Sequence, residues 1–323
     1  MSDFKTLKGL YIKHVSSDPS NLIEGQIWYN TTTQQLKVAP SISSWSSGGN
    51  INTARMYLGG AGIQTAALAI GGFVPPHSNT SEEYDGSSWT EGDNLNVTRG
   101  FNHGCGTQTA AFSIGGEAPS VPAEDATETY NGSSWTNAPN LNAGRYSLGA
   151  AGTTTAAVAF AGASGSPPTG QTTVEEFDGS SWSEVTDIPA AVTYTSGVGI
   201  QTAALAIGGA NPAFTSEVYE YDGTNWTAGG ELNTGRQGMG ASGIQTAAIA
   251  FAGVEPAKSG KTETYDGTSW TEIADLSTAR GGVGPSTGGP TSTTTAFGGD
   301  TGSVSNATEE YGNVVTLKTV TDS

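Results

Sequence analysis

Cysteine and long apolar runs are scarce in this sequence of 323 residues. Because Cys105 is the only cysteine, the chain can form no internal disulfide, and its cysteine content identifies no cellular compartment. The sequence contains no run of about 18 or more apolar residues, so it predicts no membrane-spanning helix. The first residues also lack the apolar segment of a secretory signal. If the protein acts outside a cell, we therefore expect it to be released by another route, such as lysis.

Charged residues are also few, and most of them are acidic. They make up 13% of the chain, with 12 basic against 30 acidic residues and a formal net charge of -18. This balance disfavours binding to the phosphates of nucleic acids or to an anionic membrane surface. It favours a soluble chain whose copies repel one another.

A short apolar segment, QTAALAIGG at residues 64–72, recurs along the chain. Further copies occupy residues 108–116, 154–162, 201–209 and 245–253, and a weaker copy occupies residues 292–299. The segment has no polar alternation, which predicts a strand buried on both faces. Its small side chains suit a strand that is crowded near a central axis. Regular recurrence of one segment along the chain is typical of repeat architectures.

One repeat unit can be divided into four strands, at residues 54–62, 65–72, 81–84 and 87–90. The last two flank Asp85-Gly86, a dipeptide that favours a tight hairpin turn. Asp-Gly or Asn-Gly recurs at this place in five of the six units, and the sixth has Gly312-Asn313. The loops after each Gly-Gly or Ala-Gly vary in length and composition, for example residues 73–80, 117–126 and 163–173. Fixed turns with variable loops predict a rigid scaffold that displays a changeable surface.

Tryptophan marks the same period, with spacings of 44, 46, 47, 44 and 44 residues. We expect these side chains to form a repeated part of the core: Trp45, Trp89, Trp135, Trp182, Trp226 and Trp270.

The order of these features is an apolar strand ending in Gly-Gly, a variable loop, Glu-x-Tyr-Asp and then Trp. This order resembles the Kelch repeat of β-propellers over residues 45–311. The resemblance implies an all-β fold, a six-bladed Kelch-like β-propeller at residues 45–323. The last blade would take its fourth strand from residues 314–319 or from the segment around Trp45, which would close the ring. A seventh blade built from residues 25–46 is the alternative.

Residues 1–44 lie outside the period and form a predicted N-terminal arm. Two short strands, at residues 25–30 and 34–39, flank Thr31-Thr32-Thr33 and predict a hairpin. The pattern G-x-I-W-Y-N-T-x-T-x-x-L-K resembles N-terminal hairpins of bacteriophage fibre and appendage proteins. That likeness implies attachment to other virion proteins. A hairpin that only caps the domain is the other interpretation.

All five arginines of the chain stand ten residues after a repeat tryptophan. A glutamate precedes the aromatic residue of the third strand by two positions, and the fourth unit lacks both, with Val192 and Tyr219 instead. Loss of both partners together predicts an ion pair within each unit, because an unpaired buried charge is costly. The predicted pairs are Arg55–Glu82, Arg99–Glu128, Arg145–Glu175, Arg236–Glu263 and Arg280–Glu309. Five equivalent copies favour a scaffold role, since a catalytic site joins unlike residues once.

No catalytic, cofactor or metal motif is visible. The histidines, His14, His77 and His103, have no second ligand at the spacing of a zinc site, and His77 is expected to lie in a solvated loop. DGSSW at residues 85–89 is similar to the sialidase Asp-box but lacks the residue between Asp and Gly. The glycine-rich stretch 281–289 lacks the Lys-Ser/Thr of a phosphate-binding loop.

These observations favour a non-enzymatic structural or interaction protein of a virus particle, found on the virion or outside the cell after release. Residues 1–44 would contact other virion proteins, and the variable loops would face a host receptor or a glycan. Association of several copies of the chain is left open. The alternative is a lectin or a glycan-active enzyme on a propeller scaffold.

Overall fold

The computed structural model describes residues 12–23, 25–165, 168–315 and 317–320, which belong to two compact units. The larger unit is Trp45–Tyr311, and the smaller unit combines described residues of 1–44 with those of 312–323. The predicted propeller included residues 312–323, whereas the described residues of this segment belong to the smaller unit. The physical reason is that β32 (Lys318–Thr319) pairs with β3 (Gln35–Ala39) of the arm. No helix among the described residues is long and apolar enough to cross a membrane.

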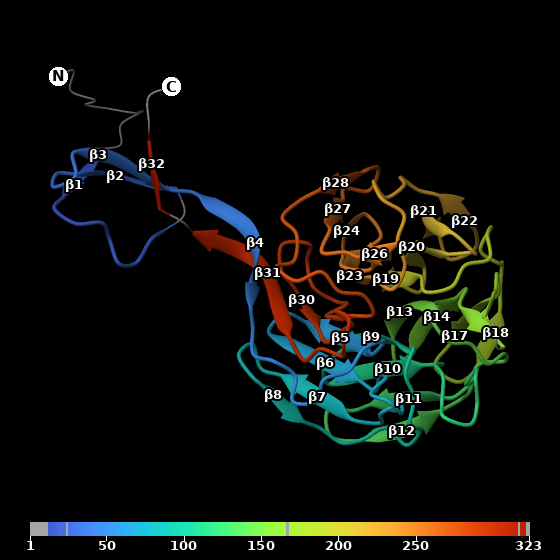
Figure 1. The fold of residues 1–323 in the computed structure, drawn as a ribbon. Coiled ribbons are helices and arrows are strands. Elements are labelled where there is room, and N and C mark those ends of the chain that lie inside the picture. The colour runs from blue at the N-terminus through green and yellow to red at the C-terminus, as the bar shows by residue number, and fades with distance from the viewer. Residues whose placement is uncertain (1–11, 24, 166–167, 316, 321–323) are drawn as a thin grey trace. The chain divides into compact units, whose positions relative to one another are not determined.

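The larger unit consists of six four-stranded antiparallel sheets, counted over the described residues (Figure 1). We number them sheet 1 to sheet 6 in chain order. Sheet 1 contains β5 (Gly59–Ile63), β6 (Ala66–Ile70), β7 (Ser81–Tyr84) and β8 (Trp89–Glu91). Sheet 2 contains β9 (His103–Thr107), β10 (Ala110–Ile114), β11 (Thr127–Tyr130) and β12 (Trp135–Ala138). Sheet 3 contains β13 (Gly149–Thr153), β14 (Ala156–Phe160), β17 (Val174–Phe177) and β18 (Trp182–Glu184).

The other three sheets follow the same plan. Sheet 4 contains β19 (Ser196–Ile200), β20 (Ala203–Ala210), β21 (Phe214–Tyr221) and β22 (Trp226–Ala228). Sheet 5 contains β23 (Gly240–Ile244), β24 (Ala247–Phe251), β27 (Thr262–Tyr265) and β28 (Trp270–Glu272). Sheet 6 contains β29 (Gly284–Pro285), β30 (Thr294–Phe297), β31 (Thr308–Val315) and β4 (Ser41–Ser47). Two-stranded ribbons occupy two of the variable loops, β15 (Ala163–Ser164) with β16 (Thr169–Gly170) and β25 (Val254–Glu255) with β26 (Ala257–Lys258).

The first strands of the six sheets surround a central axis. Neighbouring first strands contact one another in chain order, and β29 contacts β5, so the ring of sheets is closed (Figure 1). The alanine-rich segments form the second strand of each sheet, as predicted, but the axis that they were expected to line is surrounded by the first strands. Glycine explains the difference, because a Cβ atom on Gly60 would lie 1.9 Å from the Pro285 carbonyl oxygen of the next first strand. The alanine-rich strands are instead buried between neighbouring sheets.

Sheet 6 closes the ring by joining distant parts of the sequence. Its fourth strand is β4, which carries Trp45, rather than residues 314–319. Trp45 packs on Tyr311 with ring centroids 5.4 Å apart, as Trp89 packs on Tyr84 at 4.8 Å in sheet 1. The strands considered for a seventh blade, β2 (Gln26–Asn30) and β3, pair instead within the smaller unit.

The tryptophans and apolar strands fill the spaces between sheets. The repeat tryptophans are each 5–9% exposed: Trp45, Trp89, Trp135, Trp182, Trp226 and Trp270. The Trp45 indole donates to Thr262 Oγ1 in sheet 5 at 3.0 Å, and the Trp89 indole donates to Thr308 Oγ1 in sheet 6 at 3.1 Å. One apolar cluster joins Val158 and Phe160 of sheet 3 to Tyr221 and Trp226 of sheet 4. Burial between sheets thus makes each sheet depend on its neighbours.

Polar contacts between neighbouring sheets were not predicted from the sequence. The hydroxyl of Tyr221 in sheet 4 donates to Glu176 Oε1 in sheet 3 at 3.0 Å. The side-chain amide of Gln108 in sheet 2 donates to the carbonyl oxygens of Ala67 and Tyr84 in sheet 1, at 3.0 and 2.7 Å. Equivalent tyrosine contacts are Tyr84–Glu310, Tyr130–Glu83 and Tyr265–Glu220, and equivalent amides are Gln64, Gln201 and Gln245.

The smaller unit is a four-stranded sheet of β1 (Lys13–Val15), β2, β3 and β32. Strands β2 and β3 form the hairpin predicted at residues 25–39, and β1 runs parallel to β2. Trp28 is 1% exposed and donates to Asp18 Oδ1 at 2.9 Å, and the Asn30 side-chain amide donates to the same oxygen at 2.8 Å. These two hydrogen bonds lower the pKa of Asp18 below its usual value.

Candidate binding site at the mouth of the central channel

The structure brings together each predicted arginine–glutamate pair within its own sheet. All ten side chains are buried, none more than 4% exposed. The closest nitrogen–oxygen distances are 2.8 Å for Arg55–Glu82, 2.6 Å for Arg99–Glu128, 2.8 Å for Arg145–Glu175, 3.1 Å for Arg236–Glu263 and 3.1 Å for Arg280–Glu309.

The arginine does more than neutralise the glutamate. In sheet 3, Arg145 Nη1 donates to the carbonyl oxygens of Ala161 and Thr173, at 3.0 and 2.6 Å. These carbonyls lie on the two sides of the variable loop where it leaves the sheet. Glu175 Oε2 accepts the backbone N–H of Asn142 at 2.7 Å. The pair therefore clamps the base of the loop. Burial lowers the pKa of Arg145, while the charge of Glu175 opposes this shift.

Sheet 4 shows how the loop closes without this clamp. Val192 is 5% exposed, and Tyr219 packs against the same apolar cluster. Here β20 and β21 extend into the loop, pairing Gly209 with Thr215 and Ala210 with Phe214. Backbone pairing thus takes the place of the guanidinium hydrogen bonds, and only a short loop is left between the strands.

The variable loops adjoin the segments that lead into the first strands. Met56, the residue after Arg55, forms a backbone bridge with Phe73 at the start of the first variable loop. The equivalent bridges in the other sheets are Gly100–Glu117, Tyr146–Ala163, Thr193–Ala210, Gln237–Val254 and Gly281–Asp300. All six loops therefore begin beside the same end of the central channel. We call this end the mouth.

A closed belt of backbone hydrogen bonds surrounds the mouth. It is formed by the residues two positions after each arginine or its equivalent. The backbone N–H of each member donates to the backbone carbonyl oxygen of the preceding member, and Tyr57 donates to Gly282. The six members are Tyr57, Phe101, Ser147, Tyr194, Gly238 and Gly282, with N···O distances of 2.7–3.1 Å. All six have φ between 50° and 62°. This left-handed conformation favours glycine, so the four larger residues are held there against a local steric cost.

Three of the belt residues form an aromatic cluster over the channel. The rings of Tyr57 and Phe101 stack with centroids 4.3 Å apart, and the ring of Tyr194 lies 5.9 Å from that of Tyr57. Gly282 makes room for this cluster, because a Cβ atom there would lie 2.9 Å from the Tyr57 ring. The belt is therefore symmetric in its backbone and asymmetric in its side chains.

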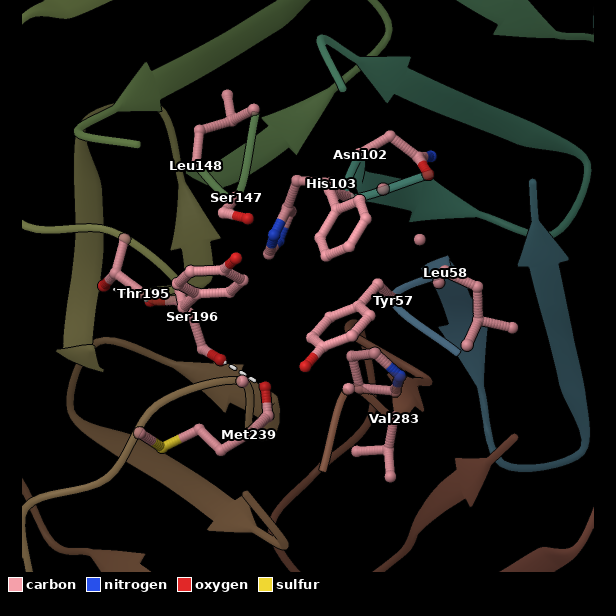
Figure 2. Close-up of a pocket in the computed structure, with 18 residues that line it drawn as sticks. Tyr57, Leu58, Asn102, His103, Ser147, Leu148, Thr195, Ser196, Met239 and Val283 are labelled. Carbon is pink, nitrogen blue, oxygen red and sulfur yellow. Dashed lines mark hydrogen bonds between the residues drawn. The ribbon is translucent and has the colours of Figure 1, made fainter. Parts of the chain in front are cut away.

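A cavity of about 70 Å³ lies at the mouth. Figure 2 shows Tyr57, His103 and Ser147 around one opening, each from a different sheet or the segment leading to it. Asn102 Oδ1, His103 Nε2 and Ser147 Oγ are buried without a hydrogen-bond partner among the described residues. Burial lowers the pKa of His103 to about 4 and raises that of Tyr57 to about 12, so both side chains are uncharged at neutral pH. The cavity thus offers apolar rings and unpaired neutral polar atoms.

No family model matches the sequence, and no curated protein matches it by sequence similarity. The fold, however, is similar to the solved structure of YjhT, with a TM-score of 0.67 and 14% sequence identity. The similarity covers 84% of this chain and 100% of that chain. The chain has a β-propeller fold. The predicted all-β propeller is therefore confirmed, with four-stranded antiparallel sheets arranged like blades.

The opposite end of the propeller channel holds a second cavity, of about 160 Å³. It is lined by the ends of the first strands, including Cys105, Gly152 and Ile200. Burial raises the pKa of the Cys105 thiol to about 12, so the thiolate needed for nucleophilic chemistry is not populated at neutral pH. Among the described residues, no group of three or more His, Cys, Asp or Glu is placed to hold a metal ion.

Sequence reasoning missed the mouth of the propeller. His77, expected in a solvated loop, is partly buried, and its ring lies 5.1 Å from that of Phe73. Burial lowers the pKa of His77, and Glu117 opposes that shift. The belt could have been found from position alone, because its members stand two residues after the repeated arginine position. Tyr57 follows Arg55, Phe101 follows Arg99 and Tyr194 follows Val192 in this way. Their residue types differ from unit to unit, so they did not stand out as a motif.

Proposed function

We propose that the chain is a Kelch-type propeller that serves as a non-enzymatic binding module on the surface of a virus particle. The observation that carries this proposal is the gathering of all six variable loops around one end of a closed, rigid ring. Loops on a fixed scaffold are the usual site of recognition, because their sequences can change without altering the fold. The host cell is the partner that such a surface would contact.

The arginine–glutamate clamps support this proposal. They are repeated and buried, and four of the five arginines donate hydrogen bonds to carbonyls at the loop bases, as a scaffold requires. Each of these charges is buried and lies against its opposite charge, so it is not accessible to a substrate. The variable part of the surface lies beyond them, in the loops and at the mouth.

The smaller unit supports attachment to the particle. It folds as its own compact sheet, and its hairpin carries the pattern that resembles those of bacteriophage fibre and appendage proteins. Several large apolar side chains of this unit are exposed: Ile23 at 64%, Ile27 at 42% and Val320 at 47%. Exposed apolar side chains gathered in a small unit favour an interface with another protein.

The test begins with purified virus particles from cells that carry the gene. Mass spectrometry should detect the chain, and cryo-electron microscopy should place the ring on the outside of the particle with its variable loops facing outward. Binding of the purified full chain to host cells should saturate. Absence of the chain from the particle would reject the virion assignment, and release of sugar from host glycans would favour the enzyme alternative.

A further inference from the structure

We infer that the mouth of the propeller binds one uncharged, hydroxyl-rich sugar unit of a surface glycan. This inference rests on the proposed function, since it names the ligand class that the loop-bearing face would recognise. The site consists of the aromatic cluster of Tyr57, Phe101 and Tyr194 together with the unpaired polar atoms His103 Nε2 and Ser147 Oγ.

The polar atoms point to a ligand that offers several hydroxyl groups. Ser147 is 7% exposed, yet Ser147 Oγ and the buried His103 Nε2 have no hydrogen-bond partner among the described residues. Buried polar atoms are normally paired, and leaving one unpaired is costly. A neutral imidazole and a hydroxyl can each donate and accept hydrogen bonds. Hydroxyl groups, which also donate and accept, complement this set.

The lining points to a ligand without charge. The residues around the cavity are aromatic, aliphatic, glycine, amide, hydroxyl and imidazole, and none carries a permanent charge. The imidazole of His103 stays neutral because its pKa is about 4. An anionic sugar would find no cation here, and the net charge of -18 would repel it. A neutral hexose or N-acetylhexosamine avoids both costs.

The aromatic rings and the cavity size point to a sugar rather than a small polyol. A pyranose has an apolar face of C–H groups that packs on an aromatic ring, and a rim of hydroxyls that pairs with polar atoms. The cavity of about 70 Å³ exceeds the space of one water molecule but does not enclose a whole pyranose. The ligand therefore inserts one edge of a terminal unit, and the variable loops contact the rest of the glycan.

The test uses the purified full-length chain on a glycan array with matched neutral and sialylated glycans, followed by titration of the best ligand. Tyr57→Gly removes one ring yet fits the belt, because Gly238 and Gly282 occupy equivalent positions at the same φ. We expect binding to weaken about tenfold or more. Ser147→Gly removes the unpaired hydroxyl, and we expect about fivefold weaker binding. The control is Ile200→Ser at the opposite end of the channel, where Ile200 is 53% exposed.

The outcomes separate this inference from the proposed function. Binding of neutral glycans that is lost in Tyr57→Gly and kept in Ile200→Ser supports the inference, provided that thermal melting shows both variants folded. Preference for sialylated glycans, or sensitivity to Ile200→Ser instead, would overturn it. If the array shows no binding while the chain still saturates host cells, the sugar is refuted and the host-binding function stands. If neither binds, the proposed function fails as well.

Discussion

The buried pair of Arg145 and Glu175 allows a quantitative test of the clamp. We consider Arg145→Val and Glu175→Tyr, which together copy the natural residues of sheet 4, Val192 and Tyr219. Each single change leaves a charged partner that is at most 1% exposed with no counter-ion. We expect each to lower the free energy of unfolding by about 3–5 kcal/mol.

The double variant should be far less damaging than the sum of the two. It leaves no buried charge, but the carbonyl oxygens of Ala161 and Thr173 lose the donor they had in Arg145. Each unpaired carbonyl costs about 1–3 kcal/mol if water cannot reach it. We therefore expect a total loss of about 2–6 kcal/mol, against about 6–10 kcal/mol for the sum of the single variants, and a coupling energy between the two sites of about 4 kcal/mol. Replacing loop 163–173 with the short loop 211–213 should recover part of the remaining loss, because backbone pairing then closes the loop base.

The measurement is urea unfolding followed by tryptophan fluorescence, for the wild type, both single variants and the double variant. The closed ring should unfold cooperatively, which must be checked with a second probe before free energies are compared. Added salt should change the coupling little, since the pair is buried. If the double variant loses as much as the two single variants combined, the two residues do not act as a pair, and the clamp is wrong.

Three further predictions concern the belt, the ring closure and the mouth. Ser147→Gly should raise the free energy of unfolding by about 0.5–1 kcal/mol, because φ is 51° there and glycine adopts it without strain; an unchanged urea midpoint would contradict this. Trp45→Ala should cost about 3–5 kcal/mol and speed hydrogen exchange first in sheet 6, whereas a uniform increase over all sheets would show that closure is not local. The free energy of unfolding should fall as the pH drops from about 6.5 to about 4, because His103 takes up a proton in the unfolded state but stays neutral when buried in the folded state. The loss is at most about 3 kcal/mol. His103→Gln should make the free energy of unfolding, measured by urea titration, less dependent on pH over this range.

The fold could be predicted because repetition amplifies weak local signals. One Asp-Gly turn or one apolar run fits many folds, but six units in register allow few architectures. The arginine–glutamate pairs were found for the same reason, since their joint loss in one unit reveals the contact. The order of strands around the axis was missed, because small apolar side chains suit both a channel lining and a strand between two sheets. The close approach of neighbouring first strands at glycines such as Gly60 and Gly197 distinguishes these positions.

The mouth could not be predicted, since it consists of the residues that differ between units. Tyr57, Phe101 and Ser147 share a backbone role but no side-chain chemistry. Their proximity follows from ring closure, which brings together residues 57 and 282. The tyrosine–glutamate contacts between sheets were missed for a related reason, because three of them join positions about one repeat apart and the fourth, Tyr84–Glu310, crosses the ring closure.

The clamps also make this ring a practical frame for engineering. Because a guanidinium fastens both sides of the loop base in sheet 3, a foreign peptide grafted between residues 163 and 173 would leave the strand ladder untouched. The same holds for the loops served by Arg55, Arg99 and Arg280, each of which donates to carbonyls on both sides of its loop. Sheet 4 has no such fastening, and its hairpin would tolerate only a tight turn. Libraries for selecting new binders are best built on the clamped positions.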